Sequence, residues 1–74
     1  MWIIDESQPK GSRVNLNKIT SIEGSSFGSN YYIYFNVEKD FTFSWVFNDK
    51  IKRDQKLKEI DNLLIQQNLD LYIL

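Results

Sequence analysis

The hydrophobic pattern in the middle of the chain predicts two strands of an antiparallel hairpin. Apolar or aromatic side chains occupy every second position of residues 31–37 and again of residues 41–47. Because strand side chains alternate between the two faces of a sheet, each segment has one strongly apolar face. Pairing Val37 with Phe41 aligns these faces across a charged turn and fixes the register. The expected core face holds Tyr31, Ile33, Phe35, Val37, Phe41, Phe43, Trp45 and Phe47.

The first thirty residues carry a weaker strand pattern. Residues 2–4 are a candidate short strand, and the segment after them is expected to be a connection because it contains the single proline and several turn-forming residues. Residues 24–30, GSSFGSN, are expected to form a flexible loop in which only Phe27 is pinned. Between these segments, a bend or bulge near residues 17–18 is expected to bring four apolar residues into one core. These four are Val14, Leu16, Ile19 and Ile22.

After Phe47 the hydrophobic period changes to that of a helix. Asn48 or Asp49 is a suitable N-cap, and the run that follows contains neither glycine nor proline. Arg53 lies on the line of the apolar stripe and is expected to lay its methylene stem over the sheet. Asn68 is a suitable left-handed residue at the C-terminal end. The apolar stripe consists of Leu57, Ile60 and Leu64, with Leu63 at its margin.

The order of strands before helix predicts a single α+β domain spanning residues 1–74. The expected architecture is an antiparallel β-meander of three to four strands packed by one C-terminal helix. Residues 69–74 alternate again, so they are interpreted as a short final strand; the alternative is a continuation of the helix. An apolar edge strand of this kind would allow pairing with a partner or with a second copy, which makes a homodimer one of the expected states. The alternative is that the strand simply closes the sheet and covers the core.

Composition argues against catalysis. The chain has no cysteine and no histidine, and its glycine-containing segment lacks the lysine and spacing of a phosphate-binding loop. Its helical acids alternate with lysines, as in solvated ion pairs. We therefore expect no enzyme and no catalytic, cofactor or metal site. No signal or membrane-spanning pattern is found, so we expect a cytoplasmic protein without membrane partners.

Amino-acid usage points to a source. Alanine is absent, while Asn, Lys, Ile, Tyr and Phe together make up 32 of the 74 residues. Codons for these five residue types are rich in A and T, so the pattern favours a low-GC bacterium or its phage.

Three residues are candidates for partner binding: Tyr32, Tyr34 and Val46, which share the face of the hairpin opposite the expected core. Tyrosine is enriched at protein interfaces, which favours a protein partner of unknown identity. A plain exposed strand is the alternative. Stacking of nucleic-acid bases on the two rings is a weaker reading, because the neighbouring positions on this face are neutral.

The basic cluster KIKRDQKLK gives a second hypothesis. Five of the nine basic residues lie within it together with one acid, a local charge of +4. Such a helix would suit contacts with phosphates, but it is also the ordinary composition of a solvated helix face. Nucleic acid is therefore the less favoured partner. This alternative would use Lys50, Lys52, Arg53, Lys56 and Lys58.

The pattern VNLNKITSIEG … YYIYF … FTFSWVFNDKIKRDQKLKEIDNLL resembles small uncharacterised proteins of low-GC bacteria and their phages. It is also similar to the second half of a pleckstrin-homology-like module, in which the last strand leads directly into a covering helix. The similarity spans roughly residues 14–64 and consists of a hydrophobic pattern with no diagnostic motif. It implies strands followed by a helix, and binding rather than catalysis, and it transfers no site residues.

Overall fold

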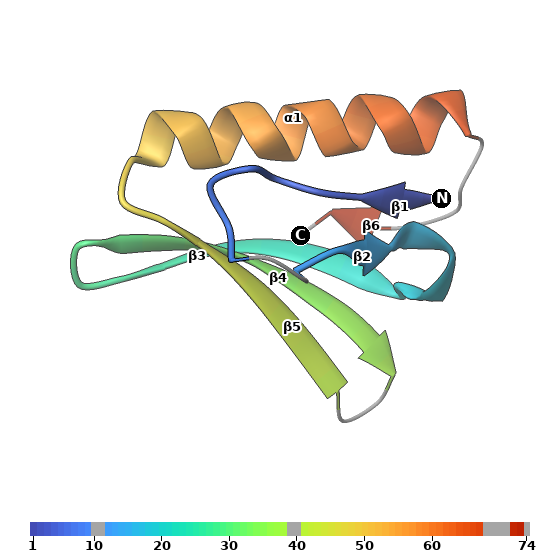
Figure 1. Ribbon diagram of the computed structural model, residues 1–74, viewed down its shortest axis with the longest axis horizontal. Helices are drawn as coiled ribbons and strands as arrows, with labels where there is room; N and C mark the ends of the chain where they lie inside the picture. Colours follow the sequence, from blue (N-terminus) through green and yellow to red (C-terminus); the bar gives the residue numbers. More distant parts are fainter. Residues whose placement is uncertain (10–11, 39–40, 68–71, 74) are drawn as a thin grey trace.

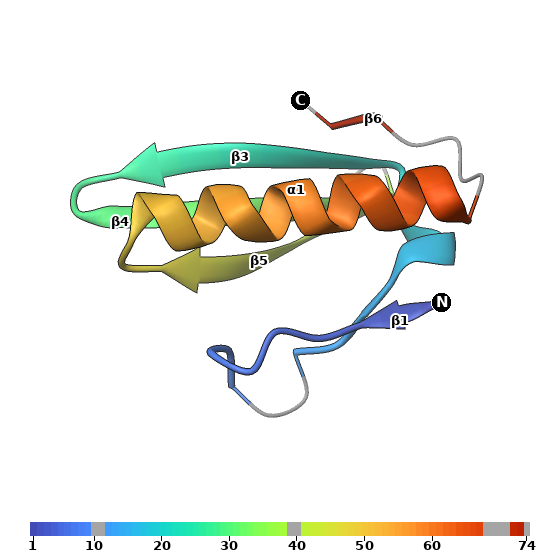
Figure 2. The same ribbon diagram turned by 90° about the horizontal axis from the view of Figure 1, so that it is seen from above.

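The computed structural model describes residues 1–9, 12–38, 41–67 and 72–73. Helix α1 lies across one face of a twisted sheet, and a short N-terminal hairpin lies beside α1 at the edge of that sheet (Figures 1 and 2). This arrangement confirms the predicted α+β architecture. In chain order the elements are β1 (Trp2–Ile3), β2 (Val14–Asn15), a 3₁₀ helix (Leu16–Lys18), β3 (Ser21–Phe27), β4 (Asn30–Glu38), β5 (Phe41–Phe47), α1 (Lys50–Gln66) and β6 (Tyr72–Ile73).

The main sheet has the strand order β5-β4-β3-β6. Strands β3, β4 and β5 form the predicted antiparallel meander, whereas β6 runs parallel to β3. Tyr72 and Ile73 therefore lie in a strand, as predicted for the tail; residues 69–71 and 74 lie outside the described residues. Among the described residues, no helix is long and apolar enough to cross a membrane.

The predicted register of the β4–β5 hairpin is confirmed along most of its length, from the pair Tyr31 and Phe47 to the pair Asn36 and Thr42. The predicted pairing of Val37 with Phe41 is wrong, because Phe41 pairs with Glu38 and a bulge lies between Asn36 and Glu38. Between these two pairs, β4 advances by two residues while β5 advances by one, so Val37 is the extra residue of the bulge. The connecting segment has no glycine to take the left-handed position of a three-residue loop, and a bulge absorbs the additional residue instead.

The prediction of a flexible loop at residues 24–30 is also wrong. Strands β3 and β4 continue until Phe27 pairs with Asn30, so only Gly28 and Ser29 connect them. Gly28 has a φ of 62°, the left-handed conformation that a two-residue hairpin turn requires and that glycine adopts without strain. Phe27 is 80% exposed at the tip of this hairpin and is not pinned.

The hydrophobic core lies between the sheet, α1 and the N-terminal hairpin. As predicted, the four apolar residues of positions 14–22 are all buried in it, and the 3₁₀ helix Leu16–Lys18 supplies the bend that brings them together. The prediction that Phe41 and Phe43 are core residues is wrong: they are 52% and 42% exposed. Their end of β5 diverges from α1 (Figure 1). The buried core is Ile3, Val14, Leu16, Ile19, Ile22, Ile33, Phe35, Trp45, Phe47, Ile60 and Leu64.

Helix α1 begins and packs as the pattern predicts. The Asp49 side chain accepts a hydrogen bond from the Ile51 amide at 2.8 Å, which satisfies one of the free N–H groups of the first turn. Ile60 and Leu64 are buried, and Leu57 and Leu63 pack against the core from its margin. The helix ends at Gln66 with Gln67 as its C-terminal cap, so the prediction for Asn68 falls outside the described residues.

Candidate functional site

The open face of the sheet, the face turned away from α1, carries all three predicted partner-binding residues. Tyr32 and Tyr34 are half-buried, and their rings stack with centroids 5.6 Å apart and planes inclined by 12°. Val46 lies opposite Tyr32 in the β4–β5 register and is 45% exposed. The structure therefore brings the three side chains together as one amphipathic patch, the tyrosine patch.

A ladder of polar side chains flanks the tyrosine patch on the open face. The amide of Asn36 donates to the hydroxyl of Ser21 at 2.8 Å, and the hydroxyl of Thr42 donates to the Asn36 amide oxygen at 2.9 Å. The three residues lie side by side on β3, β4 and β5. Cross-strand bonds of this kind hold the strands at a fixed spacing, so the tyrosine patch is presented on a rigid surface.

Charge on the open face is acidic where it is described. Glu23 lies opposite Tyr34 across β3 and β4, and strand alternation places its side chain on the same face. The described strand positions that share this face include no lysine or arginine, and Lys52 of α1 lines a hollow with Val46 at its margin. A carboxylate beside the rings repels a phosphate backbone, which disfavours the reading of Tyr32 and Tyr34 as a platform for nucleic-acid bases.

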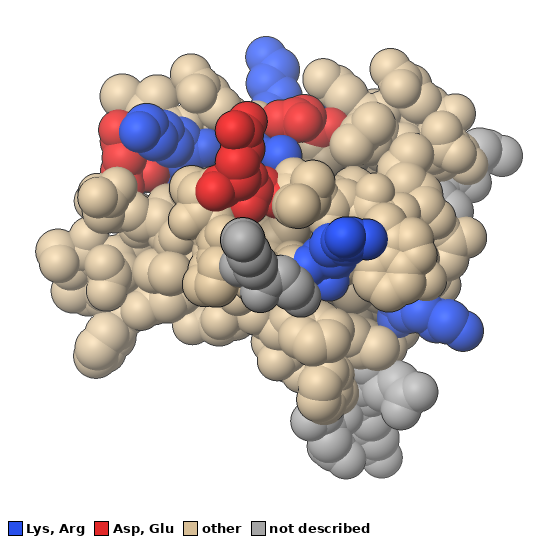
Figure 3. All heavy atoms as spheres, in the orientation of Figure 1, with Lys and Arg blue, Asp and Glu red and all other residues tan. Residues whose placement is uncertain are grey.

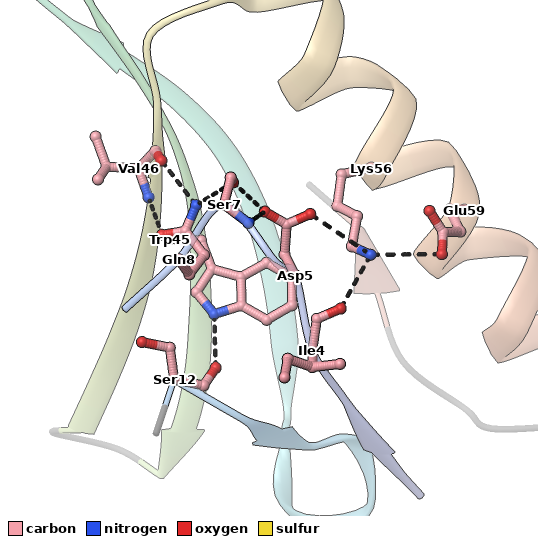
Figure 4. Close-up of polar contacts among 9 residues, drawn as sticks. All are labelled: Ile4, Asp5, Ser7, Gln8, Ser12, Trp45, Val46, Lys56 and Glu59. Atoms are coloured by element: carbon pink, nitrogen blue, oxygen red, sulfur yellow. Dashed lines mark hydrogen bonds and ion pairs between the residues drawn. The ribbon is translucent and has the colours of Figure 1, made fainter. Parts of the chain in front are cut away.

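The N-terminal segment closes part of the outer edge of β5 (Figure 4). The Gln8 amide donates to the Val46 carbonyl oxygen at 2.8 Å and accepts from the Val46 backbone N–H at 3.1 Å. One side-chain amide thus replaces the pair of bonds that a neighbouring strand would make. The indole N–H of Trp45 also donates to the Ser12 carbonyl oxygen at 2.9 Å. No sequence signal identifies Gln8, because its partner lies 38 residues away.

Arg53 is buried between α1 and the sheet, with 8% of its surface exposed. Its guanidinium donates to the Ser25 carbonyl oxygen at 2.7 Å, to the Tyr32 carbonyl oxygen at 3.3 Å and to Asp54 at 2.7 Å. Gly24 makes room for it, because a Cβ there would lie 3.3 Å from the Arg53 Nη1 atom. The side chain does lie over the sheet as predicted, but its guanidinium also forms hydrogen bonds to other groups of the protein.

Lys56 ties the N-terminal segment to α1 (Figure 4). Its Nζ atom donates to the Ile4 carbonyl oxygen at 3.1 Å, lies 3.4 Å from a Glu59 carboxylate oxygen and 3.8 Å from an Asp5 carboxylate oxygen. The same ammonium lies 5.8 Å from the centre of the Trp45 ring, within the range of a cation–π contact. With its side chain only 14% exposed, Lys56 acts as a structural cation.

The basic cluster therefore does not form one continuous basic face. Arg53 and Lys56 are engaged within the molecule, and the other three candidates, Lys50, Lys52 and Lys58, are exposed. At 100° per residue, Lys50 and Lys52 point about 160° apart around the helix axis. Lys58 lies about 80° from Lys50, so these two share one side of the helix. Contacts with consecutive phosphates along one strand would rest on that pair of cations alone.

The structure also contains a groove that the sequence patterns do not reveal. It has a volume of about 320 Å³ and lies between the N-terminal hairpin and the far end of the β4–β5 hairpin. Its residues come from separate segments of the chain, so no local motif marks it. The lining residues are Trp2, Arg13, Asn15, Lys18, Ile19, Val37 and Phe43. Elsewhere, the described part of the chain holds no group of three or more acidic side chains that could bind a metal ion.

Comparison of the chain with protein-family models, with curated proteins and with solved structures finds no match. The resemblance to pleckstrin-homology-like modules and to small phage proteins therefore stays a prediction.

Proposed function

We propose that the protein is a non-enzymatic protein–protein interaction module that contacts its partner through the tyrosine patch, Tyr32, Tyr34 and Val46. The observation that carries the proposal is the stacked tyrosine pair, held on the sheet face turned away from α1 (Figure 1). A nucleic-acid-binding function through the basic helix is the alternative, and the internal contacts of Arg53 and Lys56 argue against it.

The chemistry of the patch suits a protein surface. A tyrosine side chain offers a large apolar ring with a hydroxyl at its end, so it contributes contact area and a directed hydrogen bond with little loss of rotamer entropy. Two stacked rings restrict each other further, which lowers the entropy that ordering them on binding would cost. Val46 adds an apolar contact next to Tyr32, and the adjacent polar ladder resembles the polar rim of an interface.

Self-association belongs to the same proposal. A chain of this size gains stability from any surface that it buries against another copy, and the open face offers such a surface. A cytoplasmic location and a phage or prophage origin also remain predictions made from sequence.

Two measurements test the proposal. The first is the mass in solution from light scattering across a range of concentrations, at low and high salt, with and without a mixed oligonucleotide. The second is capture of proteins from a low-GC bacterial lysate by immobilised wild-type chain and by the double variant Tyr32→Ser/Tyr34→Ser. We expect the double variant to lose the captured proteins, the self-association, or both.

The matched control is Ile51→Ser/Ile65→Ser, which removes two exposed apolar side chains from α1. Both double variants are first shown to be folded by circular dichroism and urea titration. If the wild-type chain is strictly monomeric and both variants capture the same proteins as wild type, the proposal is wrong. Binding of the oligonucleotide that weakens steeply between about 50 and 200 mM salt would favour the alternative instead.

A further inference from the structure

The groove between the N-terminal hairpin and the far end of β5 is a concave, mainly apolar surface with exposed aromatic side chains. Trp2 is 64% exposed at one wall, and Phe43 is 42% exposed at the other. Phe41, whose ring lies 4.8 Å from that of Phe43 in an edge-to-face contact, extends the apolar surface beyond the groove. Contiguous exposed apolar surface of this kind marks a binding site more often than isolated exposed residues do.

The outer edge of β5 next to this groove has backbone groups that bond to no other residue in the described part of the chain. The N–H and C=O of Val46 point away from β4, since both bond to Gln8. Alternate residues of an antiparallel strand direct these groups to the same side, so those of Ser44 and Thr42 also point outward. No described residue bonds to them. A second hollow of about 190 Å³, lined by Phe43, Ser44 and Trp45 on one side and by residues 12–14 on the other, adjoins the edge. A strand that pairs with this edge would enter that hollow.

The charge at the groove favours an acidic occupant. Arg13 and Lys18 are both exposed and both line the groove, and no Asp or Glu lines it. Neither cation forms an ion pair with another described residue, in contrast to Arg53 and Lys56. In Figure 3 the acidic side chains gather nearer α1, while basic side chains also occur lower on this face, beside uncharged surface.

We propose that the groove and the β5 edge together bind an extended, acidic segment of another protein. The segment adds to β5 as a further strand through Thr42 and Ser44, places a large apolar side chain in the groove, and sets a carboxylate beside Arg13 and Lys18. Main-chain bonds supply affinity in this mode of recognition, and the side-chain contacts supply specificity. The groove lies on the face of the sheet opposite the tyrosine patch, but the two surfaces share strand β5, so a variant of the tyrosines is included in the test.

Two other occupants fit less well. A second copy that paired through its own β5 would bring its own Arg13 and Lys18 to the same interface, where no lining acid balances them. A single-stranded nucleic acid would use the aromatic rings and cations, but it leaves the alternating donors and acceptors of Thr42 and Ser44 without partners. A peptide matches the apolar groove, its two cations and the backbone groups of the β5 edge.

The test starts with a display library of random nine-residue peptides selected against the full chain. We expect enrichment of sequences in which acidic and large apolar residues recur at every second position. One enriched peptide is then synthesised with blocked termini, and its Kd is measured from tryptophan fluorescence. Trp2 reports binding because it is exposed at the groove, and the Trp2→Phe variant gives the contribution of Trp45, which lines the adjoining hollow.

Charge is tested with a matched pair of double variants. Arg13→Glu/Lys18→Glu is expected to raise the Kd at least tenfold. Lys50→Glu/Lys58→Glu makes the same change in net charge at exposed positions of α1 and is expected to change the Kd less than threefold. Equal weakening by both pairs would mean that only overall charge matters, and would overturn the proposal.

Strand addition is tested at Ser44. Ser44→Pro removes an outward N–H while leaving the bonds of β5 to β4 in place, since proline is tolerated at an edge position whose N–H faces outward. We expect a loss of at least tenfold in affinity, with Ser44→Ala binding as the wild type does. Circular dichroism and urea titration show that both variants are folded. If the proline variant is folded and keeps full affinity, the peptide does not pair with this edge.

The remaining outcomes of these experiments also support or overturn the proposal. If no sequence is enriched, or if the enriched peptides are rich in Lys and Arg, the proposal is wrong. If ten-residue oligo(dT) binds in a way that Trp2→Ala abolishes while no peptide binds, the groove recognises nucleic acid. If the chain dimerises and Ser44→Pro abolishes the dimer, the occupant is a second copy. The variant Tyr32→Ser/Tyr34→Ser is expected to bind the selected peptide normally, which separates this result from the fate of the tyrosine patch.

Discussion

Replacing Arg53 by methionine tests whether this cation supports the fold or is available to a ligand. Methionine keeps most of the apolar stem that lies over the sheet and removes the guanidinium with its bonds to Ser25, Tyr32 and Asp54. If Arg53 were a phosphate-binding residue on a solvated helix, its loss would leave the free energy of unfolding almost unchanged. Its burial predicts a clear loss of stability instead.

The expected loss follows from the partners of the guanidinium. Hydrogen bonds from a charged donor contribute about 1.5–3 kcal/mol each, but burying the guanidinium offsets part of that gain. Ser25 and Tyr32 are paired across β3 and β4, so their carbonyl groups keep a strand partner when the arginine is removed. Asp54 is half exposed, and its ion pair contributes about 0–1 kcal/mol. We expect Arg53→Met to cost about 1–2 kcal/mol.

Urea titration at 25 °C measures this loss, with the fluorescence of buried Trp45 as the signal. For a domain of this size, 1 kcal/mol corresponds to a fall of about 4–8 °C in Tm, so thermal melting gives an independent value. The control is Lys52→Met, which removes a neighbouring but exposed cation from the same helix and is expected to stay within about 0.5 kcal/mol of wild type. The reasoning is refuted if the two variants are equally stable.

Three further changes test other contacts of the fold by urea titration. Gly24→Ala is expected to cost about 1 kcal/mol, because the new Cβ would lie 3.0 Å from the Leu57 Cδ1 atom; unchanged stability would contradict the close approach. Gln8→Ala is expected to cost about 0.5–1.5 kcal/mol and to speed hydrogen exchange of the Val46 amide roughly tenfold, and unaltered exchange would exclude the edge contact. Gly28→Ala is expected to cost about 1–2 kcal/mol through its φ of 62° alone, with Gly28→Asn costing less; equal values would argue against a left-handed turn.

Alternation in the sequence predicted the sheet well because it is a strong constraint. A shift of one residue between β4 and β5 would turn the whole apolar set to the opposite face, so the register from Tyr31 to Asn36 follows from the pattern. Alternation states which face a side chain takes, but it does not state whether that face is covered. Phe41 and Phe43 lie on the predicted face and are exposed, because the covering helix does not reach their end of β5.

The polar contacts of the site were harder to predict, since they join residues far apart in the chain. Arg53 carried a usable signal: it lies on the apolar line of α1, and Gly24 within a strand indicates a close approach by another group. Gln8 and Lys56 carried no such signal. Nothing in the local sequence distinguishes a side chain that donates to a backbone carbonyl from one that donates to water. The groove depends on all these tertiary contacts, so it became visible only in the structure.

The exposed aromatic surface at the far end of β5 is better explained by binding than by folding. Helix α1 has 17 residues and is therefore about 25 Å long, and it begins at Lys50, close to the end of β5 where Phe47 is buried. Strand β5 diverges from that helix toward Phe41 (Figure 1). Threonine or serine at these edge positions would preserve the strand and improve solubility. Trp2 and Phe43 line the groove and Phe41 packs against Phe43, so their exposed rings match the peptide site proposed above.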